Sequence, residues 1–156
     1  MKLLFIHQNF PGQFRHLAPA LVARGHEVIA LTMRDDVPAL WQGIRVVRHA
    51  PVRSSGRDLH PWAVDFEAKV IRGESAFRAL SRLRDQGFTP DAVIAHPGWG
   101  EALFVKEVWP STRLGLYCEY FYRAAGADVG FDPEFKALDG DGACLLALKN
   151  AHLLTQ

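Results

Sequence analysis

Residues 1–32 read MKLLFIHQNFPGQFRHLAPALVARGHEVIALT and have the pattern of a strand, a turn, a helix and a second strand. Residues 2–7 (KLLFIH) form a nearly continuous apolar run, which is typical of a strand covered on both faces. After the turn, apolar residues recur with helical spacing at Phe14, Leu17, Ala18, Leu21 and Val22. Gly25 ends this helix, and residues 26–32 predict the second strand. Pro19 is expected to kink the helix or delay its regular part.

The rest of the chain continues this alternation of short apolar runs and longer helical segments. Further strands are predicted at 44–49, 91–96 and 112–118, and helices at 62–86, 98–108 and 135–151. Between them, residues 51–61 are rich in Pro, Gly, Ser and charge and predict a mobile loop. The pattern predicts an α/β fold: a Rossmann-like open, mostly parallel sheet with helices on both faces.

The last residues, 152–156 (HLLTQ), predict the beginning of another strand. Since a parallel strand needs a crossover and cover on its faces, we expect the domain of residues 1–156 to be truncated at its C-terminal end. The alternative is a complete small domain with an edge strand.

Composition excludes several classes of protein. The chain has 156 residues, of which 49% are hydrophobic and 22% charged, and this balance is typical of one soluble globular domain. The formal net charge of +1 argues against a dedicated nucleic-acid binder. The two cysteines and the absence of a signal-peptide pattern predict a cytoplasmic location. No apolar run reaches the roughly 18 residues that a membrane-spanning helix needs.

Three polar loops follow predicted strands, at residues 7–13, 96–100 and 119–123. In open parallel sheets, ligands bind beyond the carboxyl ends of the strands, so these loops are the candidate site. Gly12 and Gln13 lead into a helix, where backbone N–H groups can hold a phosphate or a sugar hydroxyl. For Gly12 the alternative is a plain tight turn.

The second and third loops supply the candidate catalytic and acceptor-binding residues. His96 stands at a strand end beside Gly98, and an imidazole there can donate to a sugar hydroxyl or a developing charge. Trp99 offers a flat apolar face for a sugar ring or a base. The third loop offers donors and acceptors for a polyhydroxyl ligand, from Glu119, Tyr120, Tyr122 and Arg123. The alternatives are a structural histidine, a core tryptophan and a loop that only packs against the domain.

Several chemistries lack their motifs. The sequence contains no phosphate-binding P-loop, no H-E-x-x-H, no C-x-x-C and no G-x-S-x-G, so neither a metal nor another cofactor is predicted. Asp35 and Asp36 follow the second strand, where a dinucleotide-binding domain has its ribose-binding acid. However, the first loop has one glycine where that fingerprint requires three. A phospho-receiver domain is also disfavoured, because the first strand ends in His7-Gln8 without an acidic cluster.

Three segments resemble one known family. Residues 7–28 (HQNFPGQFRHLAPALVARGHEV) resemble the opening of the family 4 retaining glycosyltransferases. Residues 89–103 (TPDAVIAHPGWGEAL) and 115–123 (GLYCEYFYR) are similar to the same subgroup. The resemblance covers most of the chain, and its opening and His-Pro-Gly-Trp-Gly motifs are the more specific parts.

The resemblance implies one half of a GT-B enzyme, in which two Rossmann-like domains face each other. The first domain, here residues 1–156, would bind a glycan or lipid-linked acceptor, and the absent second domain would bind most of the nucleotide sugar. A hexosyl group would be transferred with retention and without a metal. The resemblance places Gly12 and Gln13 near the donor phosphates, His96 at the transfer centre, and the acceptor along loops that include the segment after Pro51. The isolated chain is therefore expected to be inactive.

Two further interpretations stay open from the sequence. One is a stand-alone α/β module that binds a nucleotide or another small ligand, and that needs no second half. The other concerns the arginines between Arg45 and Arg57, which would face anionic headgroups in a peripheral membrane contact if the acceptor is lipid-linked. The alternative for these arginines is a solvated face or loop.

Overall fold

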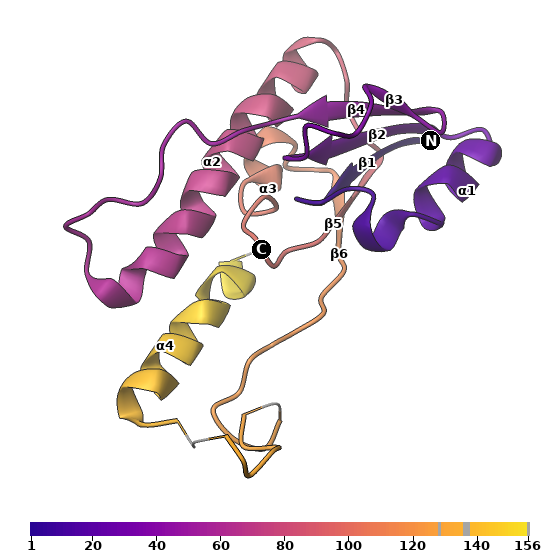
Figure 1. The fold of residues 1–156 in the computed structure, drawn as a ribbon. Helices are drawn as coiled ribbons and strands as arrows, with labels where there is room; N and C mark the ends of the chain where they lie inside the picture. The colour runs from indigo at the N-terminus through magenta and orange to yellow at the C-terminus, as the bar shows by residue number, and fades with distance from the viewer. Residues whose placement is uncertain (128, 136–137, 156) are drawn as a thin grey trace.

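The computed structural model describes residues 1–127, 129–135 and 138–155. Its centre is a six-stranded sheet in the order β3-β4-β2-β1-β5-β6 (Figure 1). The strands are β1 Lys2–Ile6, β2 Glu27–Thr32, β3 Leu40–Trp41, β4 Ile44–Arg48, β5 Ala92–Ala95 and β6 Arg113–Leu116. All neighbours are parallel except β3, which pairs antiparallel with β4.

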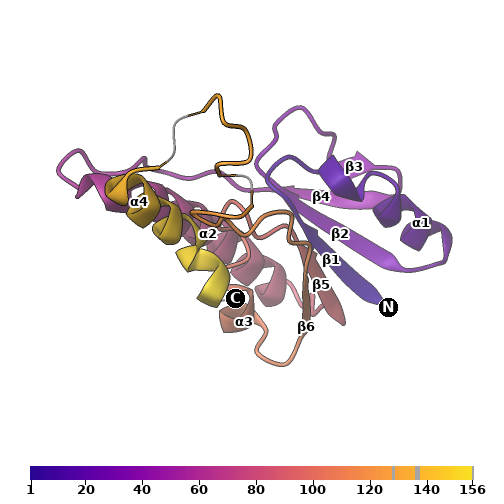
Figure 2. The same cartoon turned by 90° about the horizontal axis from the view of Figure 1, so that it is seen from below.

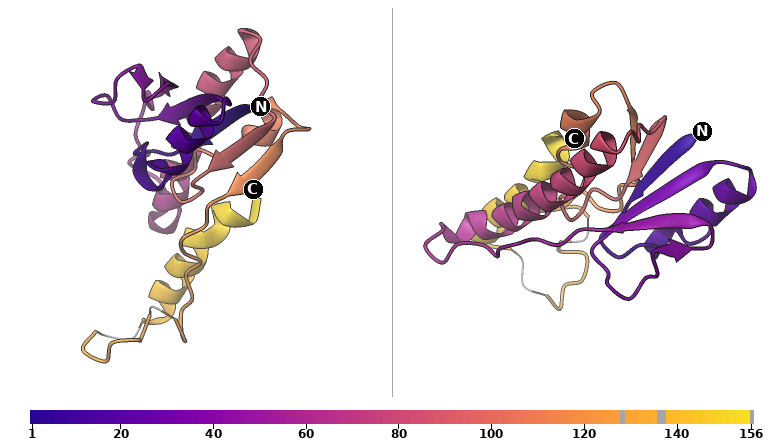
Figure 3. Two further views of the ribbon diagram at one scale, coloured as in Figure 1. Left: turned by 90° about the vertical axis from the view of Figure 1, so that its right-hand side faces the viewer. Right: turned by 90° about the horizontal axis from the view of Figure 1, so that it is seen from above.

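Helices cover both faces of this sheet. They are α1 Leu17–Ala23, α2 Val64–Asp85, α3 Val105–Val108 and α4 Gly140–Asn150, with 3₁₀ helices at Gly12–Phe14, Pro61–Ala63 and Ala151–Thr155. The helix α1 lies on one face, and α2 and α3 lie on the other (Figure 3). The predicted α/β, Rossmann-like fold is confirmed.

The side chains of β1 alternate between two buried clusters. Leu4 and Ile6 pack with residues of α2 and α3, whereas Leu3 and Phe5 pack with Phe14 and its neighbours around α1. Complete burial of each such apolar side chain stabilises the fold by about 1.5–3 kcal/mol. The apolar run of residues 2–7 therefore predicted correctly that the first strand is covered on both faces.

The first helix begins late, as Pro19 suggested. A 3₁₀ helix precedes it, and regular α-helix starts at Leu17. Pro19 is the third residue of α1, where a backbone N–H would have no acceptor within the helix. Its missing donor therefore costs little there, and no kink is needed.

Two local features differ from the sequence prediction. The helix predicted at 98–108 is regular only over Val105–Val108, and Gly100 interrupts the predicted range with φ 103°, a backbone conformation outside the helical range. The short strand β3 was not predicted. It reverses into β4 through Gln42 and Gly43, both with positive φ, as in the two-residue hairpins that favour glycine.

The C-terminal part departs most from the prediction. The helix predicted at 135–151 begins only at Gly140, where Asp139 accepts a hydrogen bond from the Gly142 N–H at 2.8 Å. Residues 136 and 137 of that prediction lie outside the described residues, as does Gln156. The strand predicted at 152–156 is wrong for residues 152–155, which continue α4 as a 3₁₀ helix. No turn separates the two helices, so the chain cannot return to the sheet edge there.

The helix α4 extends away from the sheet and lies beside α2 (Figures 1 and 2). Lys69 of α2 reaches the Lys149 carbonyl oxygen at 3.4 Å, and His152 reaches the Pro97 carbonyl oxygen at 3.1 Å. These contacts place the end of α4 next to the loop after β5. Within the described ranges, no helix is both long and apolar enough to span a membrane.

Candidate functional site

Two histidines stand at the carboxyl ends of neighbouring central strands. His7 follows β1 and His96 follows β5, and the register pairs Ile6 with Ala95 immediately before them. The His96 N–H donates to the Ile6 carbonyl oxygen at 2.9 Å, which extends the ladder by one step. As a result the two imidazole centroids lie 5.0 Å apart, and both side chains are buried.

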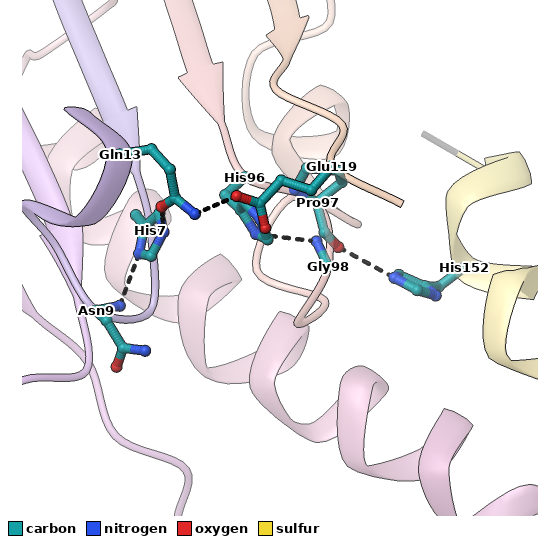
Figure 4. Close-up of polar contacts among 8 residues, drawn as sticks. All are labelled: His7, Asn9, Gln13, His96, Pro97, Gly98, Glu119 and His152. Atoms are coloured by element: carbon teal, nitrogen blue, oxygen red, sulfur yellow. Dashed lines mark hydrogen bonds and ion pairs between the residues drawn. The ribbon is translucent and has the colours of Figure 1, made fainter. Parts of the chain in front are cut away.

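A chain of hydrogen bonds joins these histidines through two further side chains (Figure 4). His7 Nε2 bonds the Gln13 amide oxygen, and the Gln13 amide nitrogen donates to Glu119 Oε1. The other oxygen of Glu119 accepts from His96 Nε2 at 3.0 Å. The three loops predicted at the carboxyl edge therefore meet in one network.

The backbone fixes the orientation of both imidazole rings. The Asn9 N–H donates to His7 Nδ1 at 2.8 Å, and the Gly98 N–H donates to His96 Nδ1 at 3.3 Å. Because Nδ1 is an acceptor in each case, a neutral ring carries its proton on Nε2. Each Nε2–H then points toward the Gln13 and Glu119 side chains.

Two of the predicted glycines make room for these rings. A Cβ atom on Gly12 would lie 2.7 Å from His7 Cε1, and one on Gly98 would lie 2.8 Å from His96 Cε1. Gly12 also has φ 44°, which favours glycine. The structure thus gives both glycines a packing role, while a role for Gly12 at a donor phosphate stays a prediction.

The network contains one ionised side chain, Glu119, and one neutral imidazole, His7. Hydrogen bonds from His96 and then from Gln13 lower the pKa of Glu119, so its carboxylate stays ionised at neutral pH. Burial lowers the pKa of His7, against the opposing effect of its Gln13 hydrogen bond, so that this ring stays neutral. The side chain of Glu119 is 35% exposed, and an ionised carboxylate can accept about four hydrogen bonds. Glu119 therefore has acceptor sites left for a ligand.

A cavity of about 390 Å³ opens beside His96 and Glu119. Five further residues of the second and third predicted loops line its wall, namely Pro97, Gly98, Trp99, Tyr120 and Tyr122. The opposite wall comes from α2 and from the C-terminal helices, through Asp65, Ala68, Lys69, Arg72, Lys149, His152 and Leu153. The size is that of a small-molecule site.

Aromatic rings and cations alternate around this cavity. Tyr120 and Tyr122 stack with centroids 5.9 Å apart, and Lys149 Nζ lies 4.4 Å from the Tyr122 ring centroid. The Arg72 guanidinium lies 5.8 Å from the Trp99 ring centroid. Trp99 itself is 41% exposed, so it is not a core residue. Flat rings with nearby donors suit a ligand that has both apolar faces and hydroxyl groups.

Most of the sequence-predicted residues come together here, but two do not: Gly12 packs against the His7 ring only, and Arg123 lies apart. Gln13, His96, Gly98, Trp99, Glu119, Tyr120 and Tyr122 either line the cavity or belong to the hydrogen-bond network. Arg123 is exposed and does not line the cavity. The catalytic and binding roles predicted for all of these residues remain predictions.

The sequence prediction missed two residues. His7 had a visible signal, since it ends a strand in the same way as His96. Lys69 had none, because a lysine on a helix is usually exposed, whereas here it is buried and paired with Asp65. Its burial depends on α4, which lies far away in the sequence.

No group of three or more His, Cys, Asp or Glu side chains is arranged to hold a metal ion in the part of the chain that the structure describes. The arrangement is instead one of hydrogen-bond donors, acceptors and aromatic faces. Such a site can bind a hydroxyl-rich ligand and hold one ionised carboxylate against it.

A known protein family matches most of the chain. A family model described as the glycosyl transferase family 4 group matches residues 24–156. The matched range contains His96, Glu119 and every residue that lines the cavity, whereas His7 and Gln13 lie before it. No curated protein matches the chain.

Proposed function

The chain belongs to the glycosyl transferase family 4 group, and we propose that it is the acceptor-side domain of an enzyme that transfers a sugar from a nucleotide sugar to a hydroxyl group with retention. At the coarser level, the family match makes the chain part of a glycosyltransferase. The retention, the hexosyl type of the donor and a glycan or lipid-linked acceptor belong to the proposal.

One observation carries the proposal: the His7–Gln13–Glu119–His96 network borders the aromatic cavity at the carboxyl edge of the sheet. The Trp99, Tyr120 and Tyr122 rings offer surfaces for the apolar faces of sugar rings. Glu119 remains ionised, and its carboxylate oxygens can accept further hydrogen bonds from a hydroxyl group of the acceptor substrate. This combination of one anion, fixed imidazole donors and aromatic faces supports a polyhydroxyl ligand.

The network gives His96 a specific part in the proposed reaction. With Nδ1 occupied by the Gly98 N–H, the ring has Nε2–H as its one donor, and Glu119 holds that donor at the cavity rim. We propose that, when the sugar is bound, this N–H is shared between Glu119 and the sugar at the centre of transfer, where charge develops. Gln13 and Gly12 would lie toward the donor phosphates. No metal or other cofactor enters the proposed reaction.

The experiment is a transfer and donor-hydrolysis screen of the full-length protein with common nucleotide sugars. We expect turnover that falls at least about a hundredfold in His96→Ala, which corresponds to about 3 kcal/mol in the barrier. His16→Ala is the matched control, because His16 is exposed and belongs to another part of the chain.

Equal turnover by His96→Ala and the unchanged protein would remove His96 from the proposed reaction. A folded full-length protein without turnover of any donor would favour the alternative of a small-ligand-binding module. Folding of each variant is checked by circular dichroism before the rates are compared.

A further inference from the structure

A second cavity, of about 210 Å³, lies beyond the carboxyl end of β4. It is bounded on one side by the segment that follows β4 and on the other by α2. Its polar lining consists of His49, Arg53, Glu74, Ser75, Arg78 and Arg82. It therefore lies at the same carboxyl edge of the sheet as the cavity beside His96, but next to β4 and not β5.

His49 supplies a buried polar atom to this cavity. The residue is 5% exposed, and its Nδ1 lies 3.0 Å from Ser75 Oγ. Its Nε2 has no hydrogen-bond partner among residues 1–127, 129–135 and 138–155. A buried nitrogen without a hydrogen-bond partner destabilises the folded state, so an outside group that bonds it would stabilise the fold.

The ring of His49 is neutral at physiological pH. Burial lowers its pKa to about 4. When the Ser75 hydroxyl donates to Nδ1, the proton of the neutral ring is on Nε2, which then offers one donor to the cavity. A phosphate oxygen is a suitable acceptor for that donor.

The charges around the cavity favour an anion. Arg78 Nη2 donates to Glu74 Oε1 at 2.6 Å, which neutralises the one carboxylate in the lining. Arg53 lies 3.7 Å from Glu67, a distance too long for a good hydrogen bond. Arg82 has no ion-pair partner in the described part of the chain. Arginine guanidinium groups bind phosphate through paired N–H donors.

We propose that this cavity binds a phosphate group of the acceptor, held by Arg78 and Arg82 of α2, by Arg53 and by His49 Nε2–H. The inference rests on the proposed function, because it assigns a chemical class to the acceptor. The phosphate belongs either to a soluble phosphorylated compound or to a lipid headgroup.

The positions of the two cavities fit one elongated ligand. Three inter-strand spacings separate β4 from β5 in the sheet, which is roughly 14 Å. The helix α2 borders both cavities, since Lys69 and Arg72 line the larger one and Ser75 and Arg78 line the smaller one. A ligand with its phosphate at β4 can therefore extend its hydroxyl group along α2 toward His96.

The test is a titration of the full-length protein with inorganic phosphate, followed by the NMR signals of the His49 imidazole. We expect saturable shifts of these signals, and a loss of affinity of at least about tenfold in Arg82→Gln. Arg84→Gln is the matched control, because Arg84 is on the same helix, pairs with Asp85 and does not line the cavity. Unmoved His49 signals, or equal affinities for both variants, would overturn the proposal.

Vesicles distinguish the two sources of phosphate. If the protein binds phosphatidylcholine vesicles that contain phosphatidic acid, and Arg82→Gln does not, the ligand is a headgroup. If inorganic phosphate binds and these vesicles do not, the ligand is soluble. Sugar transfer is measured separately, so transfer without phosphate binding refutes the phosphate site alone, and phosphate binding without transfer refutes the proposed function and shows a phosphate site that does not serve an acceptor.

Discussion

The imidazole rings of His7 and His96 are held by contacts that leave no space for a Cβ atom beside them. Gly12 closes on the first ring and Gly98 on the second, while a backbone N–H two residues further along bonds each Nδ1. Ring position and tautomer are therefore both set by short loops. A change of one methyl group in these loops is expected to act on the site before it acts on the fold.

Gly98→Ala tests this directly. Gly98 has no positive φ, so the substitution introduces no backbone strain, but its Cβ would lie 2.8 Å from His96 Cε1. We expect displacement of the His96 ring, loss of the contact with Glu119 and at least a tenfold fall in kcat/KM, or about 1.4 kcal/mol. NMR of the His96 imidazole and transfer kinetics give the measurements.

The control for this prediction is Gly56→Ala, because a Cβ on Gly56 would have no atom within 4 Å and Gly56 also lacks a positive φ. Unchanged His96 signals in Gly98→Ala would show that the ring tolerates the methyl group, and the packing role of Gly98 would then be wrong.

Glu101 is a buried carboxyl group that directly follows the loop containing His96 and Gly98. It is 1% exposed, and neither of its oxygens has a hydrogen-bond partner of normal geometry in the described ranges. Burial raises its pKa from 4.5 to about 7. Between these pH values Glu101 ionises in the unfolded chain but stays protonated in the folded protein, so the contribution of Glu101 to stability falls as pH rises through this window and levels off above pH 7.

Glu101→Gln should remove this pH dependence, which corresponds to about 3 kcal/mol between pH 4.5 and pH 7. Urea unfolding at several pH values from 5 to 8 measures it, with the exposed Glu107→Gln as control. The contribution of Glu101 is the change with pH in the difference between the unfolding free energies of Glu101→Gln and the unchanged protein, and a difference that stays constant from pH 5 to 8 would show that Glu101 is not the group responsible.

The loop after β5 and the helix α2 approach each other closely enough that only glycine fits on either side. A Cβ on Gly73 would lie 2.9 Å from the Gly100 carbonyl oxygen, and one on Gly100 would collide with the Lys69 carbonyl. This contact holds the loop that contains His96 and Trp99 against α2. The position of the cavity wall therefore depends on two glycines 27 residues apart in the sequence.

Gly73→Ala should destabilise the protein, although alanine favours helix. The overpacking against backbone costs about 1–3 kcal/mol, whereas the gain in helix propensity is about 1 kcal/mol. We expect a lower urea midpoint and shifted NMR signals of the Trp99 indole. Gly140→Ala is the control, because its Cβ would have no atom within 4 Å. A higher midpoint for Gly73→Ala than for the unchanged protein would contradict this packing argument.

Strands and helices differ in how well the sequence predicts them. The apolar runs predicted β1 and β2 to within one residue, because continuous burial leaves a strong local signal. The segment 152–155 was mispredicted, because a short apolar run such as HLLT is compatible with a strand as well as a helix. The residues that it contacts, in α2 and at Pro97, are far away in the sequence and leave no local signal.

The residues of the candidate site also divide into those with a local sequence signal and those without one. His96 was recognisable from its place at a strand end beside glycines, and Glu119 from its polar loop. The burial of Lys69 was not recognisable, since it requires the packing of α4 on α2. Likewise, the link between Gln13 and Glu119 joins residues 106 positions apart, which no local pattern indicates.

The sheet joins both halves of the core through its central strand. One cluster lies on the face of α2 and α3 and the other on the face of α1, and β1 contributes side chains to each. Neither face can lose its packing without disturbing the strand that supports the other. The domain is expected to unfold in one cooperative step.

Leu4→Ala tests this expectation. Leu4 is fully buried on the face of α2, and its truncation should cost about 2–5 kcal/mol. Near-UV and far-UV circular dichroism should still give coincident urea transitions, because β1 is common to both clusters. Leu40→Ala, in the exposed strand β3, is the control and should cost far less. Two separate transitions in Leu4→Ala would show that the faces are independent.

The spacing of the two histidine rings has a consequence beyond this chain. Their centroids are 5.0 Å apart, close to the roughly 4.8 Å that separates any two hydrogen-bonded strands. The interval is therefore set by the backbone repeat of the sheet together with the short loops that hold each ring, and a ligand that contacts both rings would find them already ordered, which lowers the entropy cost of binding. A parallel sheet with histidines at register-matched strand ends, each followed by such a short loop, would offer the same pair of imidazoles, which makes this geometry one that protein designers can transfer to unrelated scaffolds.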